Sequence, residues 1–248
     1  MECLTLAAGS SPDREVFVKV SIITPCLNSA GTIRQTMESV LDQTYKDIEY
    51  IVVDGGSDDG TQELIREYQP KFRGRIRYVS EKDKGIYDAM NKGIRMSHGR
   101  LIGIINSDDY YEPDAVENAV THMTADRYQV VYGYCRVLNN RQAVDVLKNS
   151  HQDLADQMIP HPACFVTRNV YCDFGMFLKT FRIANDYELM CRLYKSGEVK
   201  FIQIRKILAN FRMGGTCSNV ERMERENAII AYYHRMISFK DMLGRMLL

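Results

Sequence analysis

Apolar residues in the first half of the chain alternate between the spacing typical of strands and that typical of helices. Short apolar runs without a helical period predict buried strands, and the runs are Val16–Thr24, Glu49–Asp54, Arg75–Ser80 and Leu101–Ile105. Apolar positions at helical spacing separate these runs and predict helices around Ile33, Met37, Val40 and Leu41, around Leu64, Ile65 and Tyr68, and around Ile86, Met90 and Ile94. Strands that alternate with helices in this way favour an α/β fold, with a mainly parallel sheet flanked by helices.

The second half of the chain has a less regular pattern. Val130–Val137 and Ala143–Leu147 predict a pair of strands around turn residues, and Ala184–Lys195 predicts a helix. Val199–Ile204 and Lys206–Phe211 predict two further strands, and Glu221–Leu248 predicts one long amphipathic helix. We therefore expect a flexible leader over residues 1–16, one large domain over residues 17–220 and a terminal helix over residues 221–248.

Composition narrows the class of protein. The 32 basic and 32 acidic side chains leave no net charge, so nucleic acid is not expected as a partner. No apolar run has the length of a membrane span, and the N-terminus lacks the basic region of a signal peptide. The 7 cysteines include no CxxC pair, which favours reduced thiols and a cytoplasmic location.

The strand Leu101–Ile105 runs directly into Asn106-Ser107-Asp108-Asp109. Open α/β sheets bind their ligands at the carboxyl ends of their strands. Two adjacent carboxylates there repel each other, and their hard oxygen atoms suit Mg²⁺ or Mn²⁺. We therefore expect a metal site that faces a substrate diphosphate. The alternative is a solvated turn before the helix that Pro113 opens.

Two other loops at predicted strand ends carry polar clusters. In Thr24–Asn28 the ring of Pro25 stiffens the turn, and Asn28 can cap the following helix. In Asp54–Thr61 the carboxylate of Asp54 can accept hydrogen bonds from a base or a ribose, and the glycines that follow it let a ligand approach the backbone.

The loop Glu81–Gly93 completes the set. Gly85 precedes a helix whose N-terminus can face a phosphate. Asp83 and Asn91 are candidate nucleotide contacts, whereas the other charged residues of this loop are expected to be solvated.

Seven segments in this order resemble the motifs of family 2 glycosyltransferases, especially bacterial members that build cell-surface polysaccharides. They are TPCLN, VVDGGSDDGT, EKDKGIYDAMNKGI, NSDD, HPACF, NDYE and FRMGG, and the resemblance covers about Lys19 to Met213. It implies a GT-A (Rossmann-like) fold with a nucleotide-sugar half over residues 17–112 and an acceptor half over residues 113–220. It also implies a nucleotide-diphosphate donor, with a UDP-sugar favoured, a divalent Mn²⁺ or Mg²⁺, and a saccharide or lipid-linked acceptor.

The resemblance also implies roles for single residues. Pro25, Cys26, Leu27 and Asn28 would line the base pocket, and Asp54 would read the base. Asp109 would bind the metal directly, Asp108 would face the ribose or the diphosphate, and Asp186 would be the general base of an inverting transfer. This chain departs from the family in two places. Leu27 stands where many relatives have a stacking aromatic residue, and Asn106 stands where an acidic residue would add charge to the metal motif.

Reasoning from the residues alone leaves alternatives at four places. Asp186 lies at the start of a predicted helix, where an acid also stabilises the helix dipole. Arg212 precedes two glycines and can close over a diphosphate or belong to a surface loop. His161 opens an apolar segment and could reach the acceptor, although a structural role is expected. The basic and apolar face of the 221–248 helix suits the protein core or, through peripheral contact, the inner face of a membrane.

Two other functions compete with sugar transfer. A sugar-phosphate nucleotidyltransferase would need a basic, glycine-rich loop after the first strand, and TPCLNSAG has one glycine and no basic residue. A scaffold that only binds nucleotide sugars would not need Asp109 and Asp186.

Overall fold

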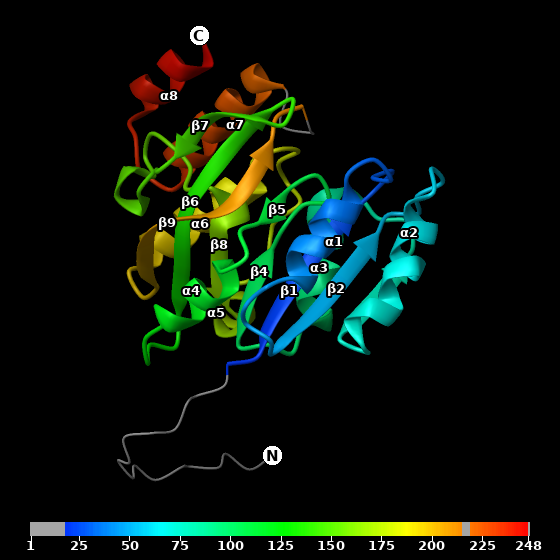
Figure 1. Ribbon diagram of the computed structural model, residues 1–248. Helices are drawn as coiled ribbons and strands as arrows, with labels where there is room; N and C mark the ends of the chain where they lie inside the picture. The colour runs from blue at the N-terminus through cyan, green and yellow to red at the C-terminus, as the bar shows by residue number, and fades with distance from the viewer. Residues whose placement is uncertain (1–17, 215–218, 248) are drawn as a thin grey trace, which may run out of the picture.

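The molecule is organised around one mixed β-sheet that carries helices on both faces (Figure 1). It is seen in a computed structural model that describes residues 18–214 and 219–247, so the predicted leader over residues 1–16 lies outside the described residues. The strand order within the described part is β3-β2-β1-β4-β8-β6-β9-β5, and β7 pairs with β6.

The first half of the described chain forms the parallel part of the sheet. Its elements are β1 (Val20–Cys26), α1 (Ile33–Leu41), β2 (Ile48–Asp54), α2 (Thr61–Tyr68), the 3-10 helix η1 (Gln69–Phe72), β3 (Ile76–Ser80), α3 (Ile86–Met96) and β4 (Leu101–Ile104). β1 pairs in parallel with β2 and β4, and β2 pairs in parallel with β3. The alternation predicted from apolar spacing is confirmed here.

The second half adds antiparallel strands to this sheet. Its elements are β5 (Tyr110–Tyr111), α4 (Ala115–Thr121), β6 (Gln129–Asn139), β7 (Gln142–Leu147), the 3-10 helices η2 (His151–Asp153) and η3 (His161–Ala163), β8 (Cys164–Thr167), α5 (Arg168–Asp173), α6 (Asn185–Ser196) and β9 (Lys200–Arg212). β8 runs antiparallel to both β4 and β6, while β9 is parallel to β6 and antiparallel to β5.

The prediction of two strands between residues 199 and 211 is wrong, because β9 is one continuous strand. Arg205 and Lys206 are both exposed, which interrupts the alternation of buried and exposed positions. The pairing of β9 with β6 shifts register beside Gly133, where an added Cβ would lie 2.7 Å from the Lys206 carbonyl oxygen. An irregularity of this kind breaks the period that identifies a strand without ending the strand.

Two apolar clusters fill the two faces of the sheet. One packs α1, α2 and α4 against alternate residues of β1 and β2, with Ile22 and Tyr50 fully buried. The other packs α3, α5 and α6 against the opposite face, with Ile23 and Ile51 fully buried. Because both faces are covered, every residue of β1 and β2 is buried. This explains why these strands read as continuous apolar runs.

The predicted single helix over residues 221–248 is instead two helices, α7 (Val220–Tyr233) and α8 (Phe239–Met246). Arg235 adopts a left-handed backbone with φ of 55°, which ends the first helix. Ser238 and Asp241 then form a reciprocal capping box that starts the second. Ile230 and Ala231 of α7 are buried against the α6 side of the core. Within the described residues, no helix is both long enough and apolar enough to cross a membrane.

Candidate active site

The loops that follow β1, β2 and β4 lie against one another at one edge of the sheet. The Asn28 amide donates to Ser57 Oγ at 2.8 Å, and the Ser29 amide donates to Thr61 Oγ1 at 2.7 Å. The hydroxyls of Ser29 and Ser107 are 2.7 Å apart, which joins the first loop to the NSDD loop. The parallel strands therefore bring these polar clusters together, as their positions at strand ends predicted.

Asn28 joins two of these loops and does not cap α1, contrary to the capping expected from sequence. Its φ is 49°, and its side-chain oxygen accepts the amide of Asp58 at 3.1 Å. Thr32 occupies the N-cap position of α1 without a side-chain capping bond. Asparagine tolerates the left-handed conformation better than most residues, which fits this tight turn.

Asp54 is fully buried at the end of β2, and its carboxylate is engaged by the surrounding loops. It accepts the amides of Gly56 and Ser57 at 3.2 and 3.1 Å and the hydroxyl of Ser80 at 2.6 Å. It also accepts a short bond from Ser57 Oγ. These bonds fix the turn after β2 and tie it to the end of β3. The Cys26 thiol contacts the same carboxylate, and its pKa is raised by burial and by the charge of Asp54.

Asp83, Leu27 and Gly55 line an adjoining part of this edge. A Cβ added to Gly55 would lie 2.6 Å from Asp83 Oδ2 and 3.4 Å from Leu27 Cδ1, so a larger residue there would displace the Asp83 carboxylate. The other Asp83 oxygen accepts the amide of Gly85 at 2.8 Å. Leu27 is 57% exposed, so its side chain offers apolar surface beside a carboxylate. This combination of an open apolar side chain and a polar acceptor suits a planar base.

Gly85 and Asn91 shape the start of α3. Gly85 is the N-cap residue with a φ of 105°, a conformation that favours glycine. Asn91 is buried, and both ends of its amide bond Phe177: it donates to the Phe177 carbonyl at 2.8 Å and accepts the Phe177 amide at 3.1 Å. A contact between Asn91 and a nucleotide would have to replace these bonds.

Asp108 and Asp109 lie in the loop between β4 and β5. Asp109 is fully buried, and its pKa is raised well above the usual range by burial and by the charge of Asp108. Burial also raises the pKa of Asp108, and the charge of Arg212 opposes that rise. A buried carboxylate beside a half-buried carboxylate of like charge is costly unless a cation compensates them.

The donor atoms of this loop fit a divalent cation that also binds a substrate. The described residues contain no group of three or more His, Cys, Asp or Glu side chains suited to a metal, and this loop offers two adjacent carboxylates, Asp108 and Asp109. One or two carboxylates, completed by phosphate oxygens, are usual for Mg²⁺. Asn106 adds a buried amide oxygen without a hydrogen-bond partner, and its Nδ2 lies 3.5 Å from Asp109 Oδ2. The fit therefore includes an uncharged oxygen where the family pattern has an acid.

Arg212 ends β9 directly beside these acids. Its backbone amide donates to Asp109 Oδ1 at 2.9 Å. Its guanidinium makes short bonds to the carbonyl oxygen of Asp108 and to Gln35 Oε1, and it lies 5.2 Å from the centre of the Tyr110 ring. The side chain is thus placed by a strand end and not by a surface loop. Of the two glycines that follow Met213, Gly215 lies outside the described residues.

Asp186 is in the first turn of α6, a helix that packs on the face of the sheet opposite to α1. The Tyr87 hydroxyl lies 3.1 Å from Asp186 Oδ1 and bonds the Ile183 carbonyl as well. Tyr87 follows Gly85 at the start of α3. It therefore attaches Asp186 to the edge of the sheet where the loops after β1, β2 and β3 lie. Buried His161 is in η3, just before β8, with its ring 5.7 Å from that of Phe177. Burial lowers the pKa of His161, and the charge of Asp186 opposes this.

Glu226 of α7 holds the segment that leads into Asp186, a contact that the sequence analysis missed. Its carboxylate accepts the amides of Arg182, Ile183 and Ala184 at 3.2, 2.8 and 3.1 Å. These amides precede the first turn of α6 and would otherwise lack partners. The only local sequence signal is the spacing of Arg222 and Glu226, which form an ion pair at 2.9 Å.

Comparison with known proteins supports the resemblance seen in the sequence. A family model described as Glycosyl transferase family 2 matches residues 21–184. The chain is 30% identical over 212 residues to a chondroitin synthase of Escherichia coli, which covers 83% of this chain and 30% of that protein. It is 26% identical over 204 residues to a PGL/p-HBAD biosynthesis glycosyltransferase of Mycobacterium tuberculosis, which covers 80% of this chain and 78% of that protein. The chain thus spans only part of the length of the synthase.

Solved structures confirm the predicted GT-A fold. S. aureus TarS, residues 1–349 in complex with UDP-GlcNAc, gives a TM-score of 0.68 at 17% identity and covers 92% of this chain and 71% of that chain. The mannosyltransferase PcManGT from Pyrobaculum calidifontis, in complex with GDP-Man and Mn²⁺, also gives 0.68 at 17% identity and covers 95% and 70%.

Proposed function

The chain belongs to glycosyl transferase family 2, and from this premise we propose that it transfers one sugar, with inversion, from a nucleotide-diphosphate donor to a saccharide or lipid-linked acceptor of a surface polysaccharide. The observation that carries this proposal is the geometry of one loop, in which the buried carboxylate of Asp109 lies next to Asp108, an unpartnered amide oxygen and a neighbouring arginine. Such a loop is suited to a cation and a diphosphate together. Family membership sets aside a sugar-phosphate nucleotidyltransferase and a scaffold without activity.

Donor recognition is assigned to the loops after β1, β2 and β3. Leu27 and Asp83 would contact the base, with Pro25 and Cys26 behind them and Gly55 leaving room. Asp54 would act on the base through the turn that its carboxylate fixes, since four bonds from the protein already engage that carboxylate. A UDP-sugar is the favoured donor on the family motif. The two solved neighbours contain UDP-GlcNAc and GDP-Man, so the base needs a direct test.

The leaving group is assigned to Arg212 and to residues 106–109 between β4 and β5, which we call the acidic loop. Asp109, with Asp108 and the amide oxygen of Asn106, would hold Mn²⁺ or Mg²⁺, which when bound stabilises the negative charge that builds on the diphosphate. Arg212 adds a fixed guanidinium beside that loop, because its contacts to Asp108 and Gln35 hold it there. A preorganised cation of this kind stabilises developing charge without reorganising.

Asp186 is assigned the role of general base. Inversion needs a base on the face of the sugar opposite to the leaving group, and Asp186 reaches the sheet edge from α6, while the acidic loop meets α1. The Asp186 carboxylate would take the proton of the acceptor hydroxyl as that oxygen forms the new bond to the anomeric carbon. The Tyr87 hydroxyl and the bonds from the backbone of residues 182–184 to Glu226 would keep the carboxylate in place. We call these backbone bonds to Glu226 the clamp.

A donor panel tests the proposed function. UDP- and GDP-sugars are incubated with the protein, Mn²⁺ and saccharide acceptors, and transfer is followed by mass spectrometry. The wild type should transfer sugar from one donor class, and Asp186→Asn should lower transfer by about 10²- to 10⁴-fold while nucleotide affinity stays the same. Asp145→Asn, at an exposed carboxylate on β7, is the matched control. Normal turnover by Asp186→Asn would exclude it as the base.

Peripheral membrane contact and a cytoplasmic location remain proposals. Exposed apolar side chains lie on α7, on α8 and directly after α8, which supports contact with an interface. They are Tyr232, Tyr233, Phe239, Leu243 and Leu247. Co-sedimentation with anionic vesicles should fall in a Tyr233→Ser, Leu243→Ser variant. Equal co-sedimentation of the wild type and the variant would remove this contact from the proposal.

A further inference from the structure

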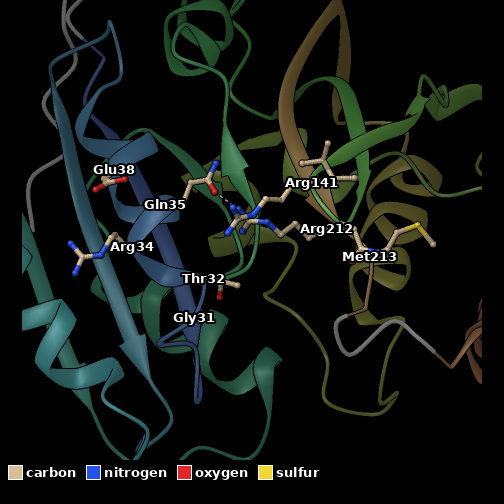
Figure 2. Close-up of a pocket in the computed structure, with 10 residues that line it drawn as sticks. Gly31, Thr32, Arg34, Gln35, Glu38, Arg141, Arg212 and Met213 are labelled. Atoms are coloured by element: carbon tan, nitrogen blue, oxygen red, sulfur yellow. Dashed lines mark hydrogen bonds between the residues drawn. The ribbon is translucent and has the colours of Figure 1, made fainter.

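A cleft of about 480 Å³ lies beside the acidic loop, between α1 and the turn that joins β6 to β7 (Figure 2). We call it the hairpin cleft, and its lining includes Thr32, Gln35, Asn140, Arg141, Arg212 and Met213. None of Leu27, Asp54, Gly55 and Asp83, which form the proposed base site, lines it. Its volume is in the range of small-molecule sites.

The β6–β7 turn holds Arg141 at the cleft. Asn139 pairs with Gln142, so Asn140 and Arg141 form a two-residue connection with φ of 46° and 68°. This turn geometry matches the twist of a hairpin, although glycine is more usual than arginine at its second position. The strand pair therefore carries a guanidinium to one fixed place, and Figure 2 shows Arg141 and Arg212 reaching into the same part of the cleft near Gln35.

The charges that line the cleft are unbalanced. Arg141 has no hydrogen-bond or ion-pair partner among the described residues, and the Arg212 guanidinium donates to two uncharged oxygens. Glu38 is the one carboxylate in the described lining, and it accepts a bond from the Tyr68 hydroxyl. Arg34 also lines the cleft, with its guanidinium 2.9 Å from the Tyr68 hydroxyl and 3.5 Å from Glu67. The lining therefore carries more positive than negative charge.

We propose that the hairpin cleft binds an anionic group, a carboxylate or a phosphate, on the acceptor saccharide, through Arg141 and Gln35, while the neighbouring Arg212 serves the donor diphosphate. Guanidinium groups bind both anions in the same fork geometry, and an amide and a hydroxyl can bond the sugar around the charge. The assignment to the acceptor rests on the proposed function, because Arg212 joins this cleft to the acidic loop where the donor diphosphate would lie. The enzyme would then prefer acidic acceptors over neutral ones.

Direct binding is the test. Methyl β-glucuronide, glucose 6-phosphate, inorganic phosphate and neutral methyl β-glucoside are titrated into the protein in the millimolar range, and the side-chain Nε–H signals of arginine are followed by NMR. An acidic sugar should shift the Arg141 signal, and the neutral glucoside should not. The acidic sugar that binds more tightly identifies the group as a carboxylate or a phosphate. No shift of Arg141 with either acidic sugar, or an equal shift with inorganic phosphate alone, overturns the proposal.

Variants separate the cleft from the active site. Arg141→Gln should weaken binding of the preferred acidic sugar about tenfold, the loss expected for one charge-assisted contact. Arg73→Gln is the matched control, because Arg73 is also exposed and left-handed, with φ of 49°, and lies before β3. Equal affinity in the wild type and Arg141→Gln overturns the inference. A wild type that binds the acid but transfers no sugar would instead refute the proposed function.

Discussion

Replacing Glu226 with glutamine tests whether α7 fixes the start of α6. Ile183 and Ala184 donate to one carboxylate oxygen, while Arg182 and Arg222 donate to the other. Glutamine keeps an acceptor for the first pair but turns an NH₂ group toward the second pair. The Arg222 side chain is half exposed and can turn to water, so the main losses are the bond from Arg182 and the charge. Since hydrogen bonds to charged groups contribute about 1.5–3 kcal/mol each, we expect a loss of about 3 kcal/mol.

The loss should depend on pH in a defined direction. The pKa of Glu226 is lowered from its ordinary 4.5, because the bonds from Arg222 and the backbone amides outweigh the effect of burial. A carboxylate with a lowered folded-state pKa stabilises the fold fully above its unfolded pKa, and the contribution is lost as pH falls through the folded value. The difference between wild type and Glu226→Gln should therefore be constant above about pH 6 and shrink below pH 4.5.

Thermal unfolding and transfer kinetics measure the two consequences. The midpoint of thermal unfolding should fall by about 6–12 °C, at about 2–4 °C per kcal/mol for a chain of this size. kcat should fall while the affinity for UDP stays unchanged, because the clamp acts on the segment before Asp186 and not on the loops after β1, β2 and β3. Glu221→Gln is the matched control, since Glu221 is 71% exposed on the same helix and pairs with Arg225. Equal losses in both variants would refute the clamp.

Three further substitutions address the acidic loop, the base site and the general base. Asp109→Ala should abolish the thermal shift that Mn²⁺ adds to UDP binding, and an unchanged shift would remove Asp109 from the metal site. Asp54→Ala should weaken selection between UDP and GDP in calorimetry and also lower stability, because four loop bonds lose their acceptor. The control Asp58→Ala, at an exposed carboxylate, should change neither. Full selectivity in Asp54→Ala would mean that another group reads the base. Tyr87→Phe should lower kcat severalfold with KM for the donor unchanged, and a fall in donor affinity instead would place Tyr87 at the donor site.

The parallel part of the fold could be predicted because its signals are local. Each strand and helix of residues 20–104 carries its own apolar period, and both faces of the sheet are covered. The C-terminal helices show a signal that was present and overlooked. Ser238 and Asp241 have the spacing of a capping box, which marks a new helix start inside the apolar pattern of residues 221–248. The continuity of β9 could not be read, since it depends on pairing with β6.

The candidate site also has features that could be predicted from the sequence and features that could not. Carboxylates at strand ends can be placed from the sequence, because parallel strands put their ends at one edge. Contacts between distant segments cannot, and Glu226 bonds amides more than 40 residues earlier in the chain. The cleft role of Arg141 is of the same kind, since it needs the β6–β7 turn to meet α1. The sequence also gives no sign that Asn106 keeps an unpartnered oxygen, because that follows from burial in the folded loop.

Arg212 connects these features into one electrostatic arrangement. Its amide holds Asp109, its guanidinium holds the Asp108 carbonyl, and the same guanidinium lines the hairpin cleft. Without a cation, the charge of Arg212 is partly offset by Asp108 and Asp109, whose pKa values it lowers against the effect of burial. A divalent cation on those carboxylates would remove that offset and leave Arg212 freer to attract an anion. Because such coupling is reciprocal, cation binding at the acidic loop and anion binding in the cleft should favour each other, which would link donor loading to the choice of an acidic acceptor.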